Sequence, residues 1–308
     1  MDWPRTHIIS ASQFSKETLG RIFEEVKEFS ENRNNLPQIM RGKVMVAFGS
    51  QPSTRTLGSF RAAMLMLGGK VNEFVEEKSS MAKGESFKDT LRVISNFGDI
   101  IVMRHPGIEA AENTIRDLPV PFISAGGGIE HPTQALLDIY TVTKEMGEVR
   151  GLKIAFVRDL RYGRVIPSWV YLLPIFEKAE VFLVSPPELA LPQEYKNILK
   201  INSVRFLEAD WKDFSENILS KIDVLMVTRI QKENLHPDIH ERVRNFGIVD
   251  GKVLRRMKSK AIIMHPLPRV DEIAEEVDTD SRAAYFRQVE NGLYTRMALL
   301  KMIFGGPL

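Results

Sequence analysis

Residues 52–56 read Pro-Ser-Thr-Arg-Thr and directly follow an apolar run at residues 44–48. This order predicts a buried strand that ends where a helix begins, because proline suits the first turn of a helix. The three hydroxyl side chains would lie beside the unpaired N–H groups of that turn, and Arg55 would add a full positive charge to the helix dipole. Such a cluster suits a phosphate-like dianion. An ordinary Ser/Thr helix cap is the alternative interpretation of the same residues.

Polar residues also follow several later apolar runs. These polar stretches are Arg104-His105-Pro106, Glu130-His131-Pro132-Thr133-Gln134, Arg158-Asp159 with Arg164, Thr228-Arg229-Ile230-Gln231 and His265-Pro266-Leu267-Pro268-Arg269. Ligands of parallel sheets bind beyond the carboxyl ends of the strands. Arginine matches carboxylate and phosphate oxygens with its bidentate fork. The edge therefore suggests a small substrate, or a pair of substrates, with several negative charges.

Several of these residues have a structural interpretation as well as a functional one. His131 could cap its own helix or be a satisfied core histidine, although Gln134 follows one turn later on the same face. Arg104 could pair with a surface carboxylate. Arg229 and Gln231 would point to the same side if extended and to different sides if helical. These alternatives stay open at the level of sequence.

Glycines and prolines near these stretches carry weaker signals. Residues 126–128 are all glycine, but no G-x-G-x-x-G pattern follows a strand here, so a simple turn is as good an interpretation as a phosphate loop. Pro266 and Pro268 would hold a turn rigidly and leave nearby carbonyl groups free to accept hydrogen bonds. No spacing of His, Asp and Glu resembles a metal site, and we expect no metal.

Short apolar runs alternate with helical patterns along most of the chain, which predicts the elements that must position these residues. The expected strands are 44–48, 71–75, 100–103, 121–124, 154–157, 181–184, 224–227 and 262–264, and the expected helices begin after Ser15 and span 53–67, 87–97, 132–146 and most of 282–304. Such alternation implies parallel sheets covered on both faces. We predict an α/β fold of two doubly wound parallel-sheet domains, with the active site in the cleft between them. The boundary is expected at residues 147–151, Gly-Glu-Val-Arg-Gly.

Composition narrows the class of protein. The chain has 308 residues, 44% of them apolar, with 42 basic and 40 acidic residues, and no cysteine. This excludes disulfides and cysteine nucleophiles, and the charge balance gives no support for a nucleic-acid or membrane partner. No basic, apolar leader follows Met1, and no apolar run approaches the roughly 20 residues of a bilayer span. We expect a cytoplasmic protein without a signal peptide.

The residues together carry a family pattern. The chain resembles the aspartate/ornithine carbamoyltransferase family, in particular the catalytic chains that use aspartate, over nearly its whole length. The motifs that carry this resemblance are Ser53-Thr-Arg-Thr56, Lys83-Gly-Glu85, Met103-Arg-His-Pro106, His131-Pro-Thr-Gln134, Tyr162-Gly-Arg164, Thr228-Arg-Ile-Gln-Lys-Glu233, His265-Pro-Leu-Pro-Arg269 and Tyr285-Phe-Arg-Gln288.

The resemblance implies transfer of the carbamoyl group of carbamoyl phosphate to L-aspartate, early in pyrimidine synthesis. Residues 1–147 would be the carbamoyl-phosphate-binding domain, with a C-terminal helix at about 284–305 packing back on it, and 148–283 the aspartate-binding domain. The phosphate-binding residues would be Ser53, Thr54, Arg55, Thr56 and Arg104, and the carbamoyl group would contact Thr56, His131, Gln134 and the carbonyl oxygens of Leu267 and Pro268. Aspartate would be bound by Ser80, Lys83, Arg164, Arg229 and Gln231. The catalytic set would be Arg55, Thr56, Lys83, Arg104 and His131.

The family chemistry requires no metal or redox cofactor, and the departing phosphate can accept the amine proton. In the family, the loop that holds Ser80 and Lys83 reaches into a neighbouring subunit's site. The resemblance therefore implies a homotrimer with shared sites, and it leaves a regulatory subunit open as a further partner.

The chain departs from the family pattern at positions close to the expected site. The departures are Gly49, Ser50 and Gln51 before Pro52, Leu57, Gly127, Arg158 where glycine is usual, and Pro167. They motivate one rival hypothesis, a non-catalytic binding or scaffold relative. Another rival is an ornithine or other amino-acid carbamoyltransferase, but the pair Arg229-x-Gln231 favours an acceptor with a second carboxylate.

Overall fold

The computed structural model describes residues 7–50 and 53–305 of the chain. Residues 1–6, the pair Gln51 and Pro52, and residues 306–308 lie outside the described residues, and some sequence predictions fall on them. The chain divides into two compact units. Unit 1 comprises residues 1–137 and 289–308, and unit 2 comprises residues 138–288. The division falls within two helices, α5 (Pro132–Met146) and α11 (Tyr285–Ile303).

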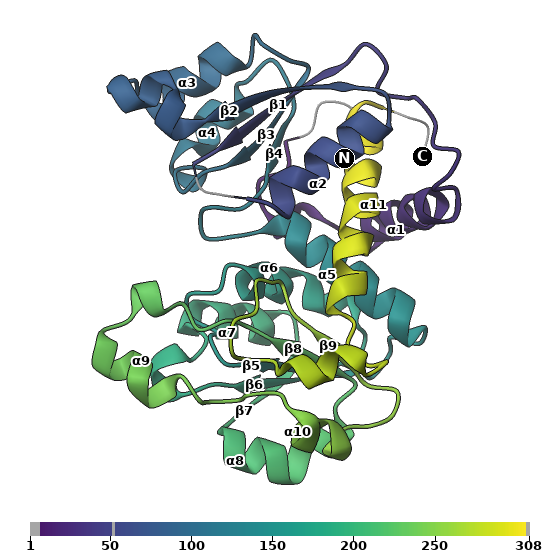
Figure 1. The fold of residues 1–308 in the computed structure, drawn as a ribbon, viewed down its shortest axis with the longest axis vertical. Helices are drawn as coiled ribbons and strands as arrows, with labels where there is room; N and C mark the ends of the chain where they lie inside the picture. Colours follow the sequence, from purple (N-terminus) through teal and green to yellow (C-terminus); the bar gives the residue numbers. More distant parts are fainter. Residues whose placement is uncertain (1–6, 51–52, 306–308) are drawn as a thin grey trace. The chain divides into compact units, whose positions relative to one another are not determined.

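Unit 1 contains a parallel sheet in the order β2-β1-β3-β4. Its strands are β1 (Val44–Gly49), β2 (Lys70–Val75), β3 (Ile100–Arg104) and β4 (Phe122–Ser124), and its remaining helices are α1 (Lys16–Glu31), α2 (Thr56–Met66), α3 (Phe87–Ile94) and α4 (Glu112–Arg116). Figure 1 shows α3 and α4 on one face of this sheet and α2 on the other. Both central strands, β1 and β3, are buried on both faces as this layering requires.

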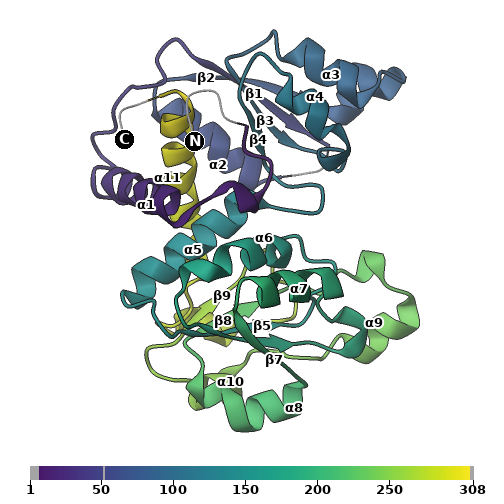
Figure 2. The same cartoon turned by 180° about the vertical axis from the view of Figure 1, so that it is seen from behind.

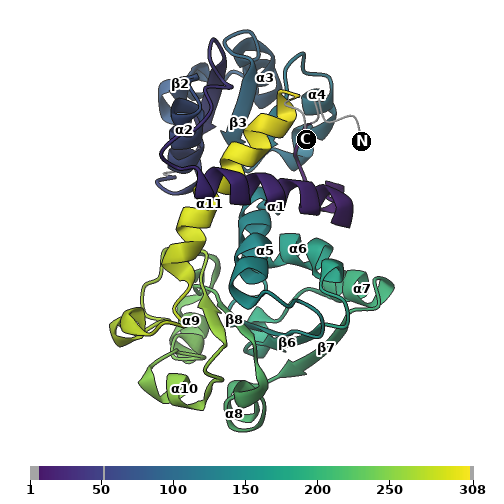
Figure 3. The same cartoon turned by 90° about the vertical axis from the view of Figure 1, so that its right-hand side faces the viewer.

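Helix α1 begins where the sequence predicts, because the Ser15 hydroxyl accepts the Thr18 N–H at 3.2 Å and so caps the first turn. It lies across the C-terminal half of α11, as Figure 3 shows, and the Lys301 ammonium contacts the Glu25 carboxylate at 2.6 Å. The end of the chain is therefore held against unit 1 by a half-buried ion pair.

Unit 2 contains a second parallel sheet, in the order β7-β6-β5-β8-β9. Its strands are β5 (Lys153–Val157), β6 (Glu180–Val184), β7 (Arg205–Ala209), β8 (Val224–Val227) and β9 (Ile262–Met264), and its helices include α6 (Val165–Leu172), α7 (Gln193–Ile201), α8 (Trp211–Asp213), α9 (Pro237–Val243) and α10 (Gly251–Arg256). Figures 1 and 2 show α6 and α7 on one face and α8 and α10 on the other. The predicted α/β class with two doubly wound parallel sheets is confirmed.

Some element boundaries differ from the prediction. Helix α2 begins at Thr56 rather than at residue 53, and α3 ends at Ile94 rather than at residue 97. The sequence did not predict β7, because this edge strand is largely exposed and has no continuous apolar run. Among the described residues, no helix combines the length and the apolar composition needed to cross a membrane.

Candidate active site

The strand orders create one switch point in each unit. In unit 1 the chain moves from β1 to β2 on one side and then returns to β3 on the other, and in unit 2 it does the same between β5 and β8. Loops at the carboxyl ends of such strand pairs diverge and leave a crevice for ligands. Ser53 follows β1, and Arg104 is the last residue of β3. In unit 2, Arg164 follows β5 and Arg229 follows β8. Sequence-predicted residues therefore occupy both switch points.

The loop after β1 presents polar groups at the start of α2. The Ser53 hydroxyl accepts the Leu57 N–H at 3.2 Å, whereas the N-cap residue of α2 is Arg55, which makes no side-chain cap hydrogen bond. Thr54 and Arg55 are exposed and open this loop to solvent. Partial desolvation lowers the pKa of Arg55 from its ordinary value. A guanidinium and hydroxyl groups at a helix start suit an anion.

Thr56 and His131 are brought together although 75 residues separate them. The Thr56 Oγ1 lies 3.2 Å from His131 Nε2, and both residues are buried. On its other side, His131 Nδ1 accepts the Gln134 N–H at 3.3 Å. A ring nitrogen that accepts an N–H carries no proton, so the neutral ring bears its proton on Nε2 and donates it toward Thr56. His131 therefore both caps α5 and orients a donor towards the β1 loop.

The three consecutive glycines do not form a phosphate loop of the usual pattern; two of them make room for histidines. Gly126 has φ of 79°, and a Cβ there would lie 2.6 Å from the His131 ring. Gly127 has φ of 121°, and a Cβ there would lie 2.6 Å from the backbone nitrogen of His105. These positions require glycine both for conformation and for space.

Arg104 ends β3 and is half-buried, and its neighbours fix the backbone around it. Its carbonyl oxygen accepts both the N–H of Ser50 at 3.0 Å and the Ser50 hydroxyl at 3.1 Å. The next residue, His105, accepts the Gly107 N–H on Nδ1 at 2.9 Å and stacks on Phe87 with ring centroids 4.0 Å apart. Burial lowers the pKa of His105, against the opposing effect of Glu76. His105 thus supports the turn that presents Arg104.

Ser80 and Lys83 form a short 3-10 turn of their own, Ser80–Lys83, and both side chains are exposed. The Ser79 hydroxyl caps this turn by accepting the Met81 N–H, and Gly84 ends it with φ of 96°. The turn is therefore ordered by local caps and is open to whatever approaches it.

In unit 2, Asp159 joins the loops that follow β5 and β8. Its Oδ1 accepts the N–H groups of Arg161 at 3.1 Å and Tyr162 at 2.9 Å, and its Oδ2 accepts the Gln231 N–H at 3.1 Å. Burial raises the pKa of Asp159, and these three hydrogen bonds oppose that effect. Thr228 completes the junction by accepting the Asp159 N–H at 2.9 Å. This carboxylate fixes the backbone of both loops.

The candidate acceptor residues lie on these two loops. Arg229 forms a two-pronged ion pair with Glu233, at 2.5 and 3.2 Å, and this pairing raises the pKa of Arg229. Gln231 donates its side-chain N–H to the Tyr162 carbonyl at 2.7 Å. The segment is neither helix nor strand. Arg164, the cap residue of α6, is half-buried.

The turn after β9 presents Leu267 and Pro268. His265 Nδ1 accepts the Leu267 N–H at 2.8 Å, and His265 Nε2 lies 2.8 Å from Glu272 Oε1. Burial alone would raise the pKa of Glu272, but its hydrogen bonds with His265 and with the Val270 N–H lower it to about 2. The buried pair ties the two ends of the turn together. Leu267 has φ of 52°, and its bond to Pro268 is cis.

A second network supports this turn from the helices of unit 2. The Gln288 amide oxygen accepts the His265 N–H at 3.0 Å, and its amide nitrogen donates to Asp138 at 2.6 Å. The other Asp138 oxygen accepts the Trp169 indole N–H at 2.9 Å. These side chains are nearly or fully buried, so the network anchors the turn to α5, α6 and α11.

Sequence reasoning missed Asp138 and Glu272 and gave Asp159 no role of its own. Asp138 has a signal in retrospect, because it is a lone acid within the apolar stretch 135–142 of α5. The remaining departures from the family pattern are accommodated: Leu57 is buried, and Pro167 lies in the first turn of α6, where proline is tolerated. Gln51 lies outside the described residues.

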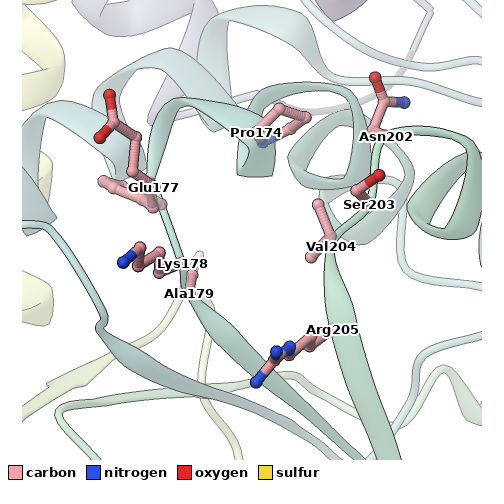
Figure 4. Close-up of a pocket in the computed structure, with 9 residues that line it drawn as sticks. Pro174, Glu177, Lys178, Ala179, Asn202, Ser203, Val204 and Arg205 are labelled. Atoms are coloured by element: carbon pink, nitrogen blue, oxygen red, sulfur yellow. The ribbon is translucent and has the colours of Figure 1, made fainter.

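A pocket of about 440 Å³ lies elsewhere on unit 2 (Figure 4). It is lined by residues such as Lys178, Asn202 and Arg205, which lie at the amino ends of β6 and β7. This edge is opposite to the one that ends in Arg164 and Arg229, so the pocket is separate from the candidate residues. Within residues 7–50 and 53–305, no group of three or more His, Asp or Glu side chains is placed to hold a metal ion.

Family models match both parts of the chain. Residues 6–144 match the carbamoyl-P binding domain of aspartate/ornithine carbamoyltransferases, and residues 150–303 match the Asp/Orn binding domain of the same family. A curated relative, the aspartate carbamoyltransferase catalytic subunit of Methanocaldococcus jannaschii, is 45% identical over 96% of this chain and 97% of its own length.

Other relatives are much longer. The chain is 44% identical to the multifunctional protein pyr-3 of Neurospora crassa and 45% identical to ura1 of Schizosaccharomyces pombe. It spans only 17% and 14% of the length of these two proteins. Among solved structures, aspartate transcarbamoylase of Trypanosoma cruzi in complex with carbamoyl phosphate superimposes with a TM-score of 0.92, at 35% identity, over 98% of this chain and 97% of that one. The same enzyme with N-(phosphonacetyl)-L-aspartic acid gives 0.91, at 36% identity, over 98% and 97%.

Proposed function

The chain belongs to the aspartate/ornithine carbamoyltransferase family, and on that premise we propose that it transfers the carbamoyl group of carbamoyl phosphate to L-aspartate. The observation that carries the choice of acceptor is the pair of arginines at one switch point. Arg164 and Arg229 follow the neighbouring strands β5 and β8, and two guanidinium groups match the two carboxylates of aspartate. An acceptor with a basic side chain would gain nothing from the second arginine.

Unit 1 is proposed to bind the donor. The hydroxyl groups of Ser53, Thr54 and Thr56 and the guanidinium groups of Arg55 and Arg104 would surround the phosphate, at a helix start whose dipole favours an anion. Support for this role comes from their common place at the carboxyl ends of β1 and β3.

The carbamoyl carbonyl is proposed to be polarised by donors that are already oriented. As the aspartate amine attacks the carbonyl carbon, negative charge develops on the carbonyl oxygen. Fixed donors such as Thr56, Arg104 and the Nε2–H of His131 would stabilise it more in the transition state than in the ground state. Loss of one such donor typically raises the barrier by about 2.7–4 kcal/mol. The carbonyl oxygens of Leu267 and Pro268 would accept hydrogen bonds from the carbamoyl amide nitrogen, and the Gln134 side-chain amide could accept or donate one.

The chemistry balances without a further reactant. A bond forms between the amine nitrogen and the carbamoyl carbon, the bond from that carbon to the phosphate oxygen breaks, and the departing phosphate takes the amine proton. The products are N-carbamoyl-L-aspartate and phosphate. Holding both substrates in register removes much of the entropic cost of a bimolecular reaction.

Assembly and setting are proposed from the family. We propose a homotrimer in which Ser80 and Lys83 complete a neighbouring subunit's site, because their turn is exposed and ordered by its own caps. One relative is named a catalytic subunit and another a multifunctional protein, so a regulatory subunit or a larger multifunctional chain is compatible with this proposal. A place in pyrimidine synthesis and a cytoplasmic location complete the proposal.

A product assay tests this function. Purified protein is incubated with carbamoyl phosphate and either aspartate or ornithine, and the carbamoylated amino acid is measured. The proposal predicts product with aspartate and little or none with ornithine. Product with ornithine alone would reverse the choice of acceptor. Absence of product with either acceptor would favour a non-catalytic relative, for which the departures at Gly127 and Arg158 are the motivating observation.

A further inference from the structure

Arg158 is the least expected residue of unit 2. It directly follows β5, has φ of 90° and is only 1% exposed. A left-handed backbone is unfavourable for a residue with a side chain, and a buried charge is unfavourable unless it is compensated. Both costs fall at the carboxyl end of the central strand, beside the switch point between β5 and β8.

The Arg158 side chain contacts two segments that are distant in sequence. Its Nη2 donates to the Arg244 carbonyl at 3.0 Å and lies 3.3 Å from Asp271 Oδ1. It also packs under the turn at Gly247, where a Cβ would lie 3.3 Å from the Arg158 Cγ. Burial lowers the pKa of Arg158, while the negative charges of Glu272, Asp271 and Asp159 oppose this effect. Among the described residues, only Nη2 has a hydrogen-bond partner, while Nε and Nη1 are buried without one, so the contacts with Arg244 and Asp271 are the ones that hold this side chain.

The segment that Arg158 contacts at Asp271 continues directly to Glu272. Glu272 Oε2 accepts the N–H groups of Val270 and Asp271, and its Oε1 pairs with His265. His265 in turn accepts the Leu267 N–H. A continuous set of contacts therefore leads from the Arg158 guanidinium to the turn that presents the Leu267 carbonyl.

The backbone at Arg158 leads in a second direction. Its neighbour Asp159 accepts the N–H groups of Tyr162 and Gln231, on the loops that follow β5 and β8. The unusual φ of Arg158 is the bend through which β5 passes into that junction. Arg158 is therefore connected by its backbone to the two loops that hold the candidate acceptor residues of unit 2, and by its side chain to the turn after β9 that presents Leu267 and Pro268.

We propose that Arg158 is a positioning residue for the carbamoyl donor: its guanidinium holds in place the turn after β9, which presents the Leu267 and Pro268 carbonyl oxygens, without touching substrate. The proposal rests on the proposed function and deepens it.

Two variants separate charge from backbone effects. Arg158→Met and Arg158→Lys both keep a Cβ and an unbranched stem, so both retain the left-handed strain and most of the packing, but only lysine keeps the charge. We expect Arg158→Met to raise the KM for carbamoyl phosphate about tenfold, which corresponds to about 1.4 kcal/mol. The KM for aspartate should stay within about twofold, because both variants keep the backbone bend that leads to the acceptor loops. Arg158→Lys should recover part of the loss.

A matched control is available in the same unit. Arg282 likewise pairs with a carboxylate, Asp280, and its side chain donates to a carbonyl, that of Leu254, rather than to the turn that presents Leu267 and Pro268. Arg282→Met should therefore leave the KM for carbamoyl phosphate unchanged even if it lowers stability. An equal rise of KM in both variants would overturn the proposal, because the effect would then be a general loss of structure.

Hydrogen exchange gives a readout that does not depend on activity. In Arg158→Met the amides of Leu267, Val270 and Asp271 should exchange at least about threefold faster than in the wild type, as expected for a local loss of protection. Asp271→Ala, which removes the carboxylate partner and leaves Arg158 in place, should shift the same amides. Unchanged exchange in both variants would overturn the positioning role. Inactive wild-type protein would instead overturn the proposed function, so the two failures are distinguishable.

Discussion

At the scale of single residues, hydrogen bonds with neighbouring groups fix the orientation of side chains in the candidate site. His131 illustrates this, because one ring nitrogen accepts the Gln134 N–H and the other lies 3.2 Å from the Thr56 hydroxyl. The contact to its own helix fixes the tautomer and the ring orientation, and the remaining nitrogen becomes a fixed donor. The structural and functional interpretations of this histidine, which compete at the level of sequence, are compatible in the folded protein.

Arg229 provides the most direct prediction at this scale. Arg229→Ala should lower kcat/KM for aspartate by roughly 30- to 1000-fold, or about 2–4 kcal/mol, because a charged contact to a carboxylate is lost. Binding of carbamoyl phosphate, measured by calorimetry, should change little. Arg242→Ala is the matched control, since Arg242 also pairs with a glutamate but lies on the exposed side of α9. Equal losses for both substrates would argue against the role of Arg229.

The buried pair of His265 and Glu272 predicts a dependence of stability on pH. The pKa of Glu272 is lowered to about 2 in the folded chain, from an ordinary value of 4.5. The contribution of Glu272 is therefore fully present above about pH 4.5 and is lost as the pH falls towards 2, because the unfolded chain takes up the proton first. The displacement corresponds to roughly 3 kcal/mol.

Urea unfolding of the wild type and of Glu272→Gln checks this sign. The free energy of unfolding of the variant should be lower at pH 7, and the difference between the two proteins should shrink when the measurements are repeated near pH 4 and pH 3. A difference that stays constant over this range would show that the carboxylate is not held in its charged form by the fold.

At the scale of elements, the strand orders explain why residues from distant motifs become functional neighbours. The loops after β1 and β3 lie at the switch point of unit 1, and those after β5 and β8 at that of unit 2. Glycines in these loops then determine how closely neighbouring side chains can approach the backbone. Gly126 is the clearest case, because its φ of 79° and the nearby His131 ring leave no room for a Cβ.

Gly126→Ala should displace the His131 ring and lower kcat by roughly a hundredfold, since small misplacements of catalytic groups are costly. Gly42→Ala is the control of matched backbone strain, because Gly42 has φ of 81° and no atom lies within 4 Å of its added Cβ. Both variants should lose similar stability in thermal unfolding. If Gly42→Ala were as inactive as Gly126→Ala, strain rather than the contact with His131 would be the cause.

Much of the element plan could be predicted from the sequence. Strands β1, β3, β5 and β8 are short apolar runs because both faces of a parallel sheet are covered, and Ser15 and Pro132 mark helix starts through local capping chemistry. Strand β7 could not be predicted in this way, since it is an exposed edge whose residues follow no apolar pattern. The sequence predicts the start of α2 three residues too early, because residues 53–55 precede the helix and the Ser53 hydroxyl contacts its first turn from outside, at the Leu57 N–H.

The candidate site was less accessible to sequence reasoning than the fold. Candidate residues such as the exposed Arg55 and the half-buried Arg229 belong to recognisable motifs. Buried carboxylates such as Asp138, Asp159 and Glu272 have roles that depend on partners distant in sequence, which no local pattern reveals. The position of the Arg158 side chain could not be predicted either. A bulky cation at a glycine position could have disrupted the loop, but the side chain is buried against Asp271.

At the scale of the whole molecule, the proposed trimer predicts complementation between inactive chains. Lys83→Ala and Arg55→Ala chains, each nearly inactive alone, should regain activity when mixed under conditions of subunit exchange. Some sites in the mixed trimers then combine an intact Lys83 from one chain with an intact Arg55 from another. For a random mixture, sites with both residues intact make up about a quarter of the total. No recovery after verified exchange would count against shared sites.

The central proposal is that the chain binds one ligand with a phosphate-like group and two carboxylates, and that both Arg55 and Arg229 are needed for its tight binding. Calorimetric titration with N-(phosphonacetyl)-L-aspartic acid tests it most directly. We predict one molecule bound per chain and a Kd that rises at least about tenfold, or 1.4 kcal/mol, in each of Arg55→Ala and Arg229→Ala. A wild-type chain that does not bind the compound, or a Kd that either substitution leaves unchanged, would contradict the account.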